Sequence, residues 1–185
     1  ESCIGANRFY VHHTRAEEFS SSLAHAMSTL VLGDGMKEGV DVGPLVNAST
    51  INKVEQLVDQ AVELGAKVLT GGSRLAAPGF FYQPTVLVDI PKHADILREE
   101  IFGPVAPIVT FTSQEEVIAA ANDTVFGLAA YVIGANVGNA LAVAEQLEAG
   151  VLGVNRGFIS DPAAPFGGVK QSGIGREGSQ DGLHE

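Results

Sequence analysis

The chain has 185 residues, of which 45% are hydrophobic and 18% are charged, and its formal net charge is −11. This composition excludes an intrinsically disordered chain and is typical of a globular domain large enough to bury a core. The acidic balance excludes a nucleic-acid partner, because phosphate binding requires a basic face. The single cysteine excludes an intrachain disulfide and, with the acidic surface, indicates a reducing, cytoplasmic compartment.

The apolar runs of the chain are short. None approaches the ~20 residues that a membrane-spanning helix needs, so we expect no membrane partner. The first ten residues, ESCIGANRFY, have neither the basic head nor the apolar stretch of a signal peptide. They also lack an initiator methionine, from which we expect that residue 1 is not the start of the natural protein.

The first predicted elements are a strand and a helix. Residues 8–13 (RFYVHH) predict a short strand. A capping box, in which the Thr14 hydroxyl and the Glu17 carboxylate satisfy the first free amides, predicts a helix that runs to about Leu30. Residues 31–46 are rich in glycine and predict a loop.

An amphipathic helix and two strands follow that loop. The helix is predicted from about Ser49 to Leu64, and Gly65 ends it. Strands are predicted at 66–72 and 81–90; Pro84 in the second indicates an edge strand or the start of a strand. The apolar stripe of the helix consists of Ile51, Val54, Leu57, Val58, Ala61 and Val62.

The second half of the chain continues the alternation of strands and helices. Its predicted elements are a helical turn at 94–100, strands at 105–111, 129–135 and 151–155, and helices at 113–122 and 136–148. A capping box from Ser113 to Glu116 begins the first of these helices, and Gly150 follows the second. This rhythm predicts an α/β fold of three layers, α/β/α, with a largely parallel sheet.

A glycine-rich segment near the end, PFGGVKQSGIGREG (165–178), contains Gly173, Gly175 and Gly178 at the spacing of a dinucleotide-binding fingerprint. A true fingerprint follows an apolar strand, opens a helix and has an acidic residue ~20 positions later. Here the polar residues KQS precede the motif, and the sequence after it is too short for the crossover helix. We therefore interpret the segment as a loop whose glycines let the backbone pass close to another surface.

Two neighbouring histidines, His12 and His13, lie on the first predicted strand. Successive side chains of a strand point to opposite faces, so this pair cannot chelate one metal ion. We therefore assign no metal site.

Four stretches carry a resemblance to a known family. They are ESCIGANRFYV, REEIFGPV, GVLGVNRGFIS and APFGGVKQSGIGREGS, in that order. Together they resemble the NAD(P)-dependent aldehyde dehydrogenase superfamily over essentially the whole chain. A lone cysteine is more often a small buried apolar residue than a nucleophile. The resemblance implies instead that Cys3 is the catalytic thiol, which forms a thiohemiacetal with the aldehyde and then a thioester that water hydrolyses.

The same resemblance implies a cofactor contact in REEIFGPV. Two adjacent acids are by themselves usually solvated surface. In the family, the residue matching Glu100 accepts hydrogen bonds from the nicotinamide ribose, and the residue matching Phe102 packs against the nicotinamide. Gly103 and Pro104 provide a sharp turn that presents both. The cofactor is NAD or NADP, and the sequence does not choose between them.

The segment NRGFISDPAAPFGG most resembles the succinate-semialdehyde dehydrogenase branch of the superfamily. The resemblance implies that Ser160 binds the distal carboxylate of a short semialdehyde, although a serine here could simply cap a loop. Phe158 and Phe166 would wall the aldehyde tunnel, or could equally be core. Arg156 would add positive charge near the carboxylate, or point to solvent.

The resemblance also implies how the chain is organised. Residues 1–185 match the catalytic, thiol-bearing domain. The N-terminal dinucleotide-binding domain, the general-base glutamate and the oxyanion asparagine lie outside the chain. We expect a homo-oligomer, a dimer or tetramer, for the full-length protein and little turnover by this chain alone. Two alternatives stay open: a non-catalytic module that keeps the fold, or a related dehydrogenase with a different aldehyde or acceptor.

Overall fold

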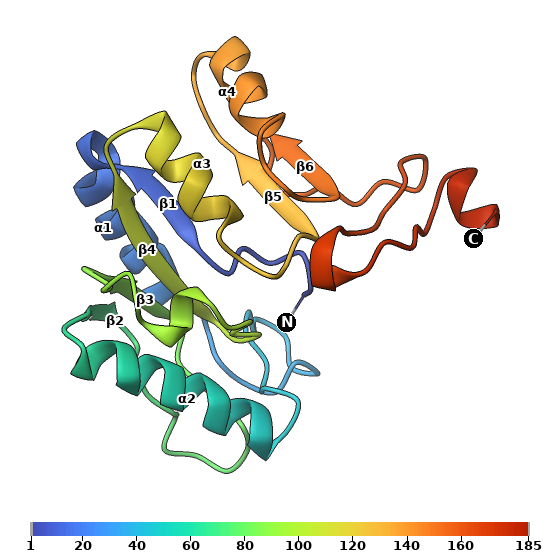
Figure 1. Cartoon of the computed structure of the whole chain (residues 1–185). Helices are drawn as coiled ribbons and strands as arrows, with labels where there is room; N and C mark the ends of the chain where they lie inside the picture. Colours follow the sequence, from blue (N-terminus) through green and yellow to red (C-terminus); the bar gives the residue numbers. More distant parts are fainter. Residues whose placement is uncertain (1, 185) are drawn as a thin grey trace. The chain divides into compact units, whose positions relative to one another are not determined.

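The computed structural model describes residues 2–184, and the chain divides into two compact units. The first unit is Glu1–Thr112 and the second is Ser113–Glu185 (Figure 1). The first unit contains strands β1 (Phe9–His12), β2 (Lys67–Thr70), β3 (Thr85–Val88) and β4 (Val105–Phe111) and helices α1 (Ala16–Ser28) and α2 (Ala48–Glu63). The second contains helices α3 (Gln114–Asn122) and α4 (Val137–Ala144) and strands β5 (Ala129–Val132) and β6 (Val151–Val154).

A four-stranded sheet in the order β1-β4-β3-β2 forms the centre of the first unit. β4 pairs in parallel with both β1 and β3, whereas β2 runs antiparallel to β3. β3 therefore lies inside the sheet, so Pro84 precedes a strand and does not mark an edge. The amide of Thr85 donates to the Pro104 carbonyl at 2.8 Å, and the ladder starts directly after the proline.

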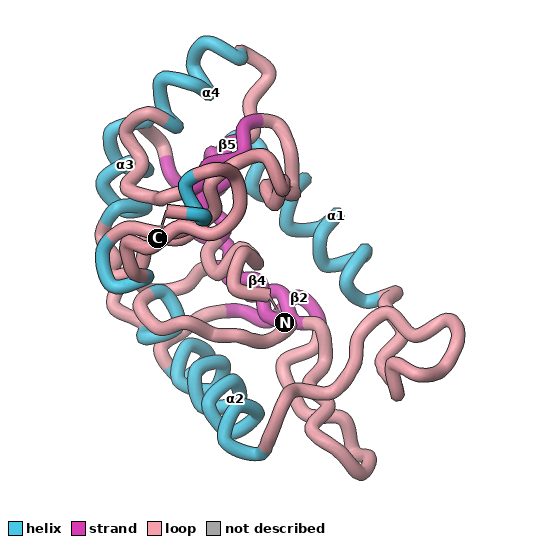
Figure 2. Tube along the Cα trace, turned by 90° about the vertical axis from the view of Figure 1, so that its right-hand side faces the viewer, coloured by secondary structure: helices cyan, strands magenta, loops and turns pink. Residues whose placement is uncertain are grey.

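The two helices of the first unit cover opposite faces of this sheet, as Figure 2 shows for α1 and α2 around β2 and β4. The alternation along β3 explains this arrangement, because Val86 packs with α1 and Leu87 with α2. The predicted three-layer α/β/α fold with a largely parallel sheet is confirmed. The α1-side cluster comprises Val86, Ala106 and Ile108 with Phe9, Val11, Leu23, Ala24, Met27 and Val88.

Helix α2 follows the prediction closely. Asn47 caps it, and its Oδ1 accepts from the Thr50 amide at 2.9 Å. Gly65, with φ +114°, ends it. Five residues of the predicted stripe are buried, but Val62 is 42% exposed, so its assignment to the stripe is wrong. Val62 lies at the border of the apolar face, and this border faces solvent.

The capping box predicted at Thr14 is wrong. Helix α1 begins at Ala16 with Arg15 as its N-cap, and no side chain caps it. A short 3₁₀ turn from His13 to Arg15 precedes the helix. The Thr14 hydroxyl hydrogen-bonds instead to Nδ1 of His12, at 2.8 Å. Because the Thr14 hydroxyl bonds to a side chain of the preceding strand, it does not cap the helix.

In the second unit, β5 and β6 pair in parallel. Ser113 caps α3 as predicted, because its Oγ accepts from the Glu116 amide at 3.1 Å. Helix α4 ends at Ala144, earlier than predicted. The amides of Gln146 and Leu147 bond at three-residue spacing, and the Asn122 side chain bonds to the Gln146 carbonyl and the Glu148 amide. The strand predicted as buried, β5, is half-buried.

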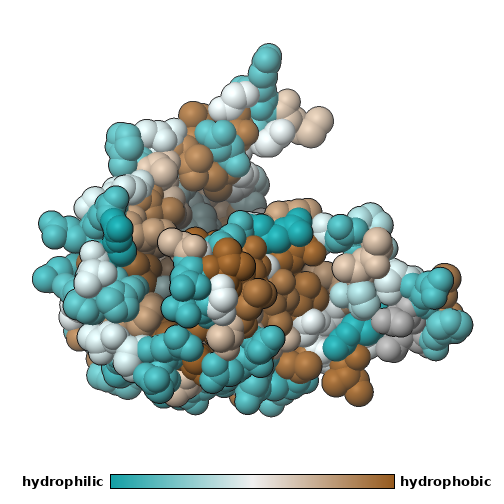
Figure 3. Space-filling view, turned by 90° about the horizontal axis from the view of Figure 1, so that it is seen from above, coloured by the Kyte–Doolittle hydropathy of each residue, from teal (hydrophilic) through white to brown (hydrophobic). Residues whose placement is uncertain are grey.

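Hydrophobic residues also remain at the surface. Figure 3 shows one face, on which hydrophobic residues form patches between hydrophilic ones. The exposed set includes Ile133, Val137 and Leu141 around the start of α4. Within the described residues, no helix has both the length and the apolarity that crossing a bilayer would require.

Tyr82 provides a test of the core. It is 1% exposed, and among the described residues its hydroxyl has no hydrogen-bond partner. Burial, and then the nearby Asp59 and Glu55 carboxylates, raise the pKa of its phenol. Tyr82→Phe should therefore raise the free energy of unfolding at pH 7 by about 1 kcal/mol, since it removes an unpaired polar group from the core.

The gain from Tyr82→Phe should grow above pH ~10, because the unfolded wild type then ionises the phenol while the folded form does not. Urea unfolding at pH 7 and at high pH measures both effects. Tyr10→Phe is the control, because the Tyr10 hydroxyl accepts from Arg8 Nη1 at 3.1 Å and its loss should bring no gain. A clear loss of stability in Tyr82→Phe at pH 7 would contradict the interpretation.

Candidate functional site

The thiol of Cys3 is exposed, in a turn that precedes β1. Two hydrogen bonds form this turn: Gly5 N–H donates to the Ser2 carbonyl at 3.0 Å, and Ile4 N–H donates to Ser2 Oγ at 3.4 Å. The exposure excludes the ordinary interpretation of a lone cysteine as a small buried apolar residue. A reactant in solvent can therefore reach the sulfur atom.

The Glu100–Phe102 segment lies between a 3₁₀ turn and β4. Glu100 is exposed, whereas the neighbouring Ile101 is 1% exposed and anchors the segment in the core. Phe102 is half-buried and has φ +53°, in the left-handed region. A Cβ on the next residue, Gly103, would lie 2.7 Å from Val54 Cγ2. The backbone therefore turns tightly against α2, and Glu100 projects from an anchored segment.

Asn7 ties the chain just after Cys3 to this segment. Its Nδ2 donates to the Glu99 carbonyl at 2.9 Å, and its Oδ1 accepts from the Ile101 amide at 2.8 Å. From α2, Lys53 Nζ donates to the Glu100 carbonyl at 2.8 Å. The parallel pairing of β1 with β4 explains the juxtaposition, because the starts of adjacent parallel strands lie at one sheet edge.

The predicted cofactor contacts agree in chemistry with a ribose. In the described part of the chain, no ion pair or hydrogen bond engages the Glu100 carboxylate. Its two oxygens can therefore accept from two neighbouring hydroxyls. The half-buried Phe102 ring offers a flat apolar surface beside it. These two residues fit the nicotinamide half of a dinucleotide.

Three of the predicted substrate residues, Arg156, Phe158 and Ser160, lie in the loop directly after β6, in the second unit. Asn155, with φ +53°, holds the start of this loop through two hydrogen bonds to the backbone of Gly134. Ile159 is 6% exposed and packs on Gly153, where an added Cβ would lie 2.7 Å from its Cγ2. The residues on both sides of Ile159 are exposed, and Phe158 is 59% exposed.

Ser160 and Phe158 therefore face solvent on either side of a buried anchor, and Arg156 is exposed nearby in the sequence. The exposure rules out Phe158 as plain core. Among the described residues, no hydrogen bond or ring contact joins Ser160, Phe158 and Phe166. Phe166 is half-buried. The structure therefore shows the surroundings of each residue and not a shared pocket for them.

The Gly-x-Gly-x-x-Gly segment is a loop, as interpreted. Phe166 and Glu177 exchange two backbone hydrogen bonds of 2.7 Å across its base. Arg176 Nη1 donates to the Gly168 carbonyl at 2.9 Å inside it. A 3₁₀ turn precedes Gly173, where a fingerprint would have a strand. A cavity of about 350 Å³ is lined by this loop, Phe166 and Arg176 among its residues.

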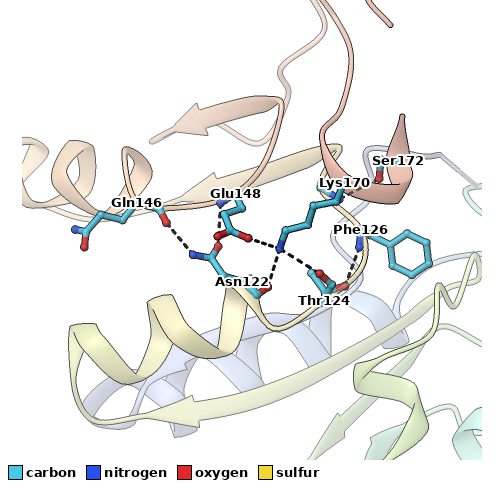
Figure 4. Close-up of polar contacts among 8 residues, drawn as sticks. Asn122, Thr124, Phe126, Gln146, Glu148, Lys170 and Ser172 are labelled. Carbon is cyan, nitrogen blue, oxygen red and sulfur yellow. Dashed lines mark hydrogen bonds and ion pairs between the residues drawn. The ribbon is translucent and has the colours of Figure 1, made fainter. Parts of the chain in front are cut away.

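Lys170 anchors the same loop to the end of α3 (Figure 4). Its Nζ donates to the carbonyls of Asn122 and Thr124, at 2.8 and 3.1 Å, and pairs with the Glu148 carboxylate. Lys170 has φ +55°, and the backbone strain of that conformation is offset by three charge-assisted contacts. Ser172 Oγ adds a bond from the Gly127 amide at 3.0 Å.

Asn122 completes the network of Figure 4. Its Nδ2 donates to the Gln146 carbonyl at 2.8 Å, and its Oδ1 accepts from the Glu148 amide at 2.9 Å. One asparagine thus fixes the backbone on both sides of Leu147, and its own carbonyl receives Lys170. The loop that carries Phe166 is held by the backbone carbonyls of Asn122 and Thr124 at the end of α3 and by the Glu148 carboxylate after α4.

The expectation that His12 and His13 point to opposite faces is wrong. His13 lies in the 3₁₀ turn and not in the strand, and the two ring centroids are 4.6 Å apart. His12 also packs edge-on against Phe111 at 5.4 Å. Among the described residues, no group of three or more His, Cys, Asp or Glu side chains could hold a metal ion.

Comparison with known proteins gives a consistent result. The sequence profile described as the aldehyde dehydrogenase family matches residues 1–185. The succinate-semialdehyde dehydrogenase of Paenarthrobacter nicotinovorans is 50% identical over all of this chain and 41% of its own length. The NADP(+) succinate-semialdehyde dehydrogenase of Escherichia coli is 45% identical, and the glutarate-semialdehyde dehydrogenase of Pseudomonas aeruginosa is 46% identical. Each of these two alignments covers all of this chain and 38% of the relative.

Solved structures agree with this result. The succinate-semialdehyde dehydrogenase from Burkholderia pseudomallei superposes with a TM-score of 0.96 at 46% identity, over 99% of this chain and 38% of that one. An NAD+ complex of aldehyde dehydrogenase from Bacillus cereus gives 0.94 at 39% identity, over 98% and 37%. The chain thus spans about two fifths of the length of the proteins it matches.

Proposed function

Because the chain belongs to the aldehyde dehydrogenase family, we propose that the protein oxidises a short carboxylated aldehyde to the corresponding acid. The acceptor is NAD or NADP, and succinate semialdehyde is the proposed substrate. One observation carries the proposal: the exposed Cys3 thiol lies in a turn that Asn7 ties to the segment of Glu100 and Phe102. The hydrogen bonds of Asn7 thereby connect the segment of the candidate nucleophile to the segment of a candidate cofactor contact.

In the proposed mechanism, Cys3 is the nucleophile that forms the covalent intermediates. Its thiolate forms a bond to the aldehyde carbon, and the carbonyl oxygen becomes the oxyanion that the Cys3 amide stabilises. NAD or NADP, when bound, supplies the acceptor for the hydride that this carbon loses. Cys3 then carries the acyl group as a thioester, which water cleaves to release the acid and the thiol. Glu100 holds the ribose hydroxyls, and Phe102 supports the ring.

Ser160 is the proposed contact for the distal carboxylate of the substrate. Its exposed hydroxyl can donate to a carboxylate while staying neutral. Exposed Arg156 adds positive charge, and Phe158 and Phe166 supply apolar walls for the carbon chain. The relatives named for succinate semialdehyde support this choice. A second candidate, an aldehyde one carbon longer, is supported by the relative named for glutarate semialdehyde.

We also propose that residues 1–185 form the thiol-bearing domain of a homo-oligomeric dehydrogenase. The exposed apolar side chains of Ile133, Val137 and Leu141 support an oligomer, because burial of such side chains stabilises subunit contacts. The 185-residue chain on its own is proposed to turn over little. An assay of this chain alone tests that point, and robust turnover by it would contradict the proposal.

A substrate comparison tests the proposed function. In the protein as the cell makes it, kcat/KM should be at least about tenfold higher for succinate semialdehyde than for uncharged butanal, since a hydrogen bond to a charged group is worth about 1.5–3 kcal/mol. Ser160→Ala should raise KM for succinate semialdehyde about tenfold and leave that for butanal unchanged.

The matched control for Ser160→Ala is Ser28→Ala. The Ser28 hydroxyl donates to the His25 carbonyl at the end of α1 and is not part of the proposed site. This variant should leave both KM values unchanged. A preference for butanal in the wild type would remove the assignment of a carboxylated substrate. Equal kinetics of wild type and Ser160→Ala would remove the role of Ser160 alone.

A further inference from the structure

The side-chain amide of Asn7 makes two bonds, one as a donor and one as an acceptor. It donates to the Glu99 carbonyl and accepts from the Ile101 amide, so it bonds the backbone on both sides of Glu100. The two bonds join residues that are 92 and 94 positions apart in the chain. They fix the backbone from which the Glu100 side chain projects.

Three further contacts complete the frame around Glu100. Lys53 Nζ donates to its carbonyl at 2.8 Å, and the Ile101 side chain is buried beside it. The Glu99 amide donates to the Asp95 carbonyl at 2.9 Å. The backbone polar groups around Glu100 are thus engaged, whereas its carboxylate is left for a ligand. The backbone of Glu100 is therefore fixed in place, while its carboxylate can still accept hydrogen bonds from a ligand.

We propose that Asn7 is a positioning residue that fixes the Glu100 carboxylate with respect to the Cys3 thiol. Asn7 lies four positions after Cys3, and the hydrogen-bonded Ser2–Gly5 turn shortens the connection between them. The assignment rests on the proposed function, because it takes Glu100 as the dinucleotide contact. It goes beyond that function by naming the residue that couples the dinucleotide contact to the nucleophile.

Asn7→Asp is the sharpest variant, because it keeps the size and the acceptor but loses the donor and places a charge against the Glu99 carbonyl. It should weaken binding of NADH or NADPH about tenfold in a fluorescence titration, which corresponds to the loss of one to two hydrogen bonds. KM for the dinucleotide should rise by the same factor, and KM for the aldehyde should stay unchanged. Hydrogen exchange at the Ile101 amide should become faster.

Asn122→Asp is the matched control. Asn122 also uses its side-chain amide twice, because Nδ2 donates to the Gln146 carbonyl at 2.8 Å and Oδ1 accepts from the Glu148 amide at 2.9 Å, and neither bond involves the frame around Glu100. This variant should lower the free energy of unfolding without changing the dinucleotide affinity. If Asn7→Asp fails to fold, Lys53→Met removes the bond to the Glu100 carbonyl from the other side. It should weaken dinucleotide binding in the same direction.

The outcomes separate the two proposals. Unchanged dinucleotide affinity in Asn7→Asp, together with faster exchange at Ile101, would overturn the positioning role and leave the proposed function intact. Failure of the wild type to bind NADH or NADPH would overturn the proposed function and the positioning role with it. An equal loss of affinity in Asn122→Asp would show that the effect of Asn7 is one of general stability, and would also overturn the assignment.

Discussion

Replacing Cys3 with serine should lower kcat for aldehyde oxidation by more than about 10³-fold while dinucleotide binding is retained. A serine hydroxyl is far less acidic than a thiol and forms an ester in place of the readily hydrolysed thioester. Because the side chain is exposed, the substitution removes no core contacts and the fold should keep its stability. Steady-state kinetics and a fluorescence titration with NADH or NADPH measure the two effects separately.

Alkylation identifies the same atom independently. Iodoacetamide should modify Cys3 faster than it modifies free cysteine, and an aldehyde substrate should slow the modification. Ser2→Ala, next to the thiol, is the control and should keep the labelling rate within about twofold, since Ser2 Oγ contributes one long hydrogen bond to the turn. Labelling no faster than that of free cysteine, or full activity of Cys3→Ser, would mean that the nucleophile lies outside this chain or that the chain is a non-catalytic module.

Gly150→Ala should lower the free energy of unfolding of the second unit by about 3 kcal/mol. The Gly150 amide donates to the Gly127 carbonyl at 2.9 Å, so its backbone cannot move freely. An added Cβ would collide with the Gly167 carbonyl oxygen and lie 2.7 Å from the Gly168 Cα. Backbone atoms cannot rotate away as a flexible side chain can, so the loop that carries Phe166 must shift. Urea unfolding measures the loss.

Gly157→Ala is the matched control for that loss of stability. It lies in the same unit, and an added Cβ would have no atom within 4 Å. The substitution should change the free energy of unfolding by less than about 0.5 kcal/mol. Equal stability of the Gly150 and Gly157 variants would show that the loop yields without cost, and that the close packing of glycines at Gly150 is not a source of stability.

Local patterns predicted the fold well. The short apolar run VAPIVTF located β4 at 105–111 without error, and the spacing of Ile51, Val54 and Leu57 located α2 within one residue at either end. The errors arose where a side chain had a partner that the local pattern does not show. His12 takes the Thr14 hydroxyl, and Asn122 takes the backbone that would have extended α4.

The candidate site was predicted less completely. The resemblance drew attention to Cys3 and Glu100, and their exposure agrees with accessible groups. Asn7 and Lys53 were missed, because their bonds to the Glu99–Ile101 backbone join residues 92, 94 and 47 positions apart. Helical and strand periodicities report only on neighbours within about one or two turns. The available signal was a polar amide two residues before the first strand.

The pairing of β1 with β4 has a consequence for the synthesis of the protein on the ribosome. Cys3 is translated before the segment that Asn7 contacts, which follows more than 90 residues later. At about 5–20 residues per second, the thiol remains without that segment for roughly 5–20 s. Contacts of such high sequence separation also form slowly in a complete chain. The nascent polypeptide therefore contains the Cys3 thiol before the segment of Glu100 and Phe102 exists, and during that interval the thiol lacks the neighbours that the folded chain gives it.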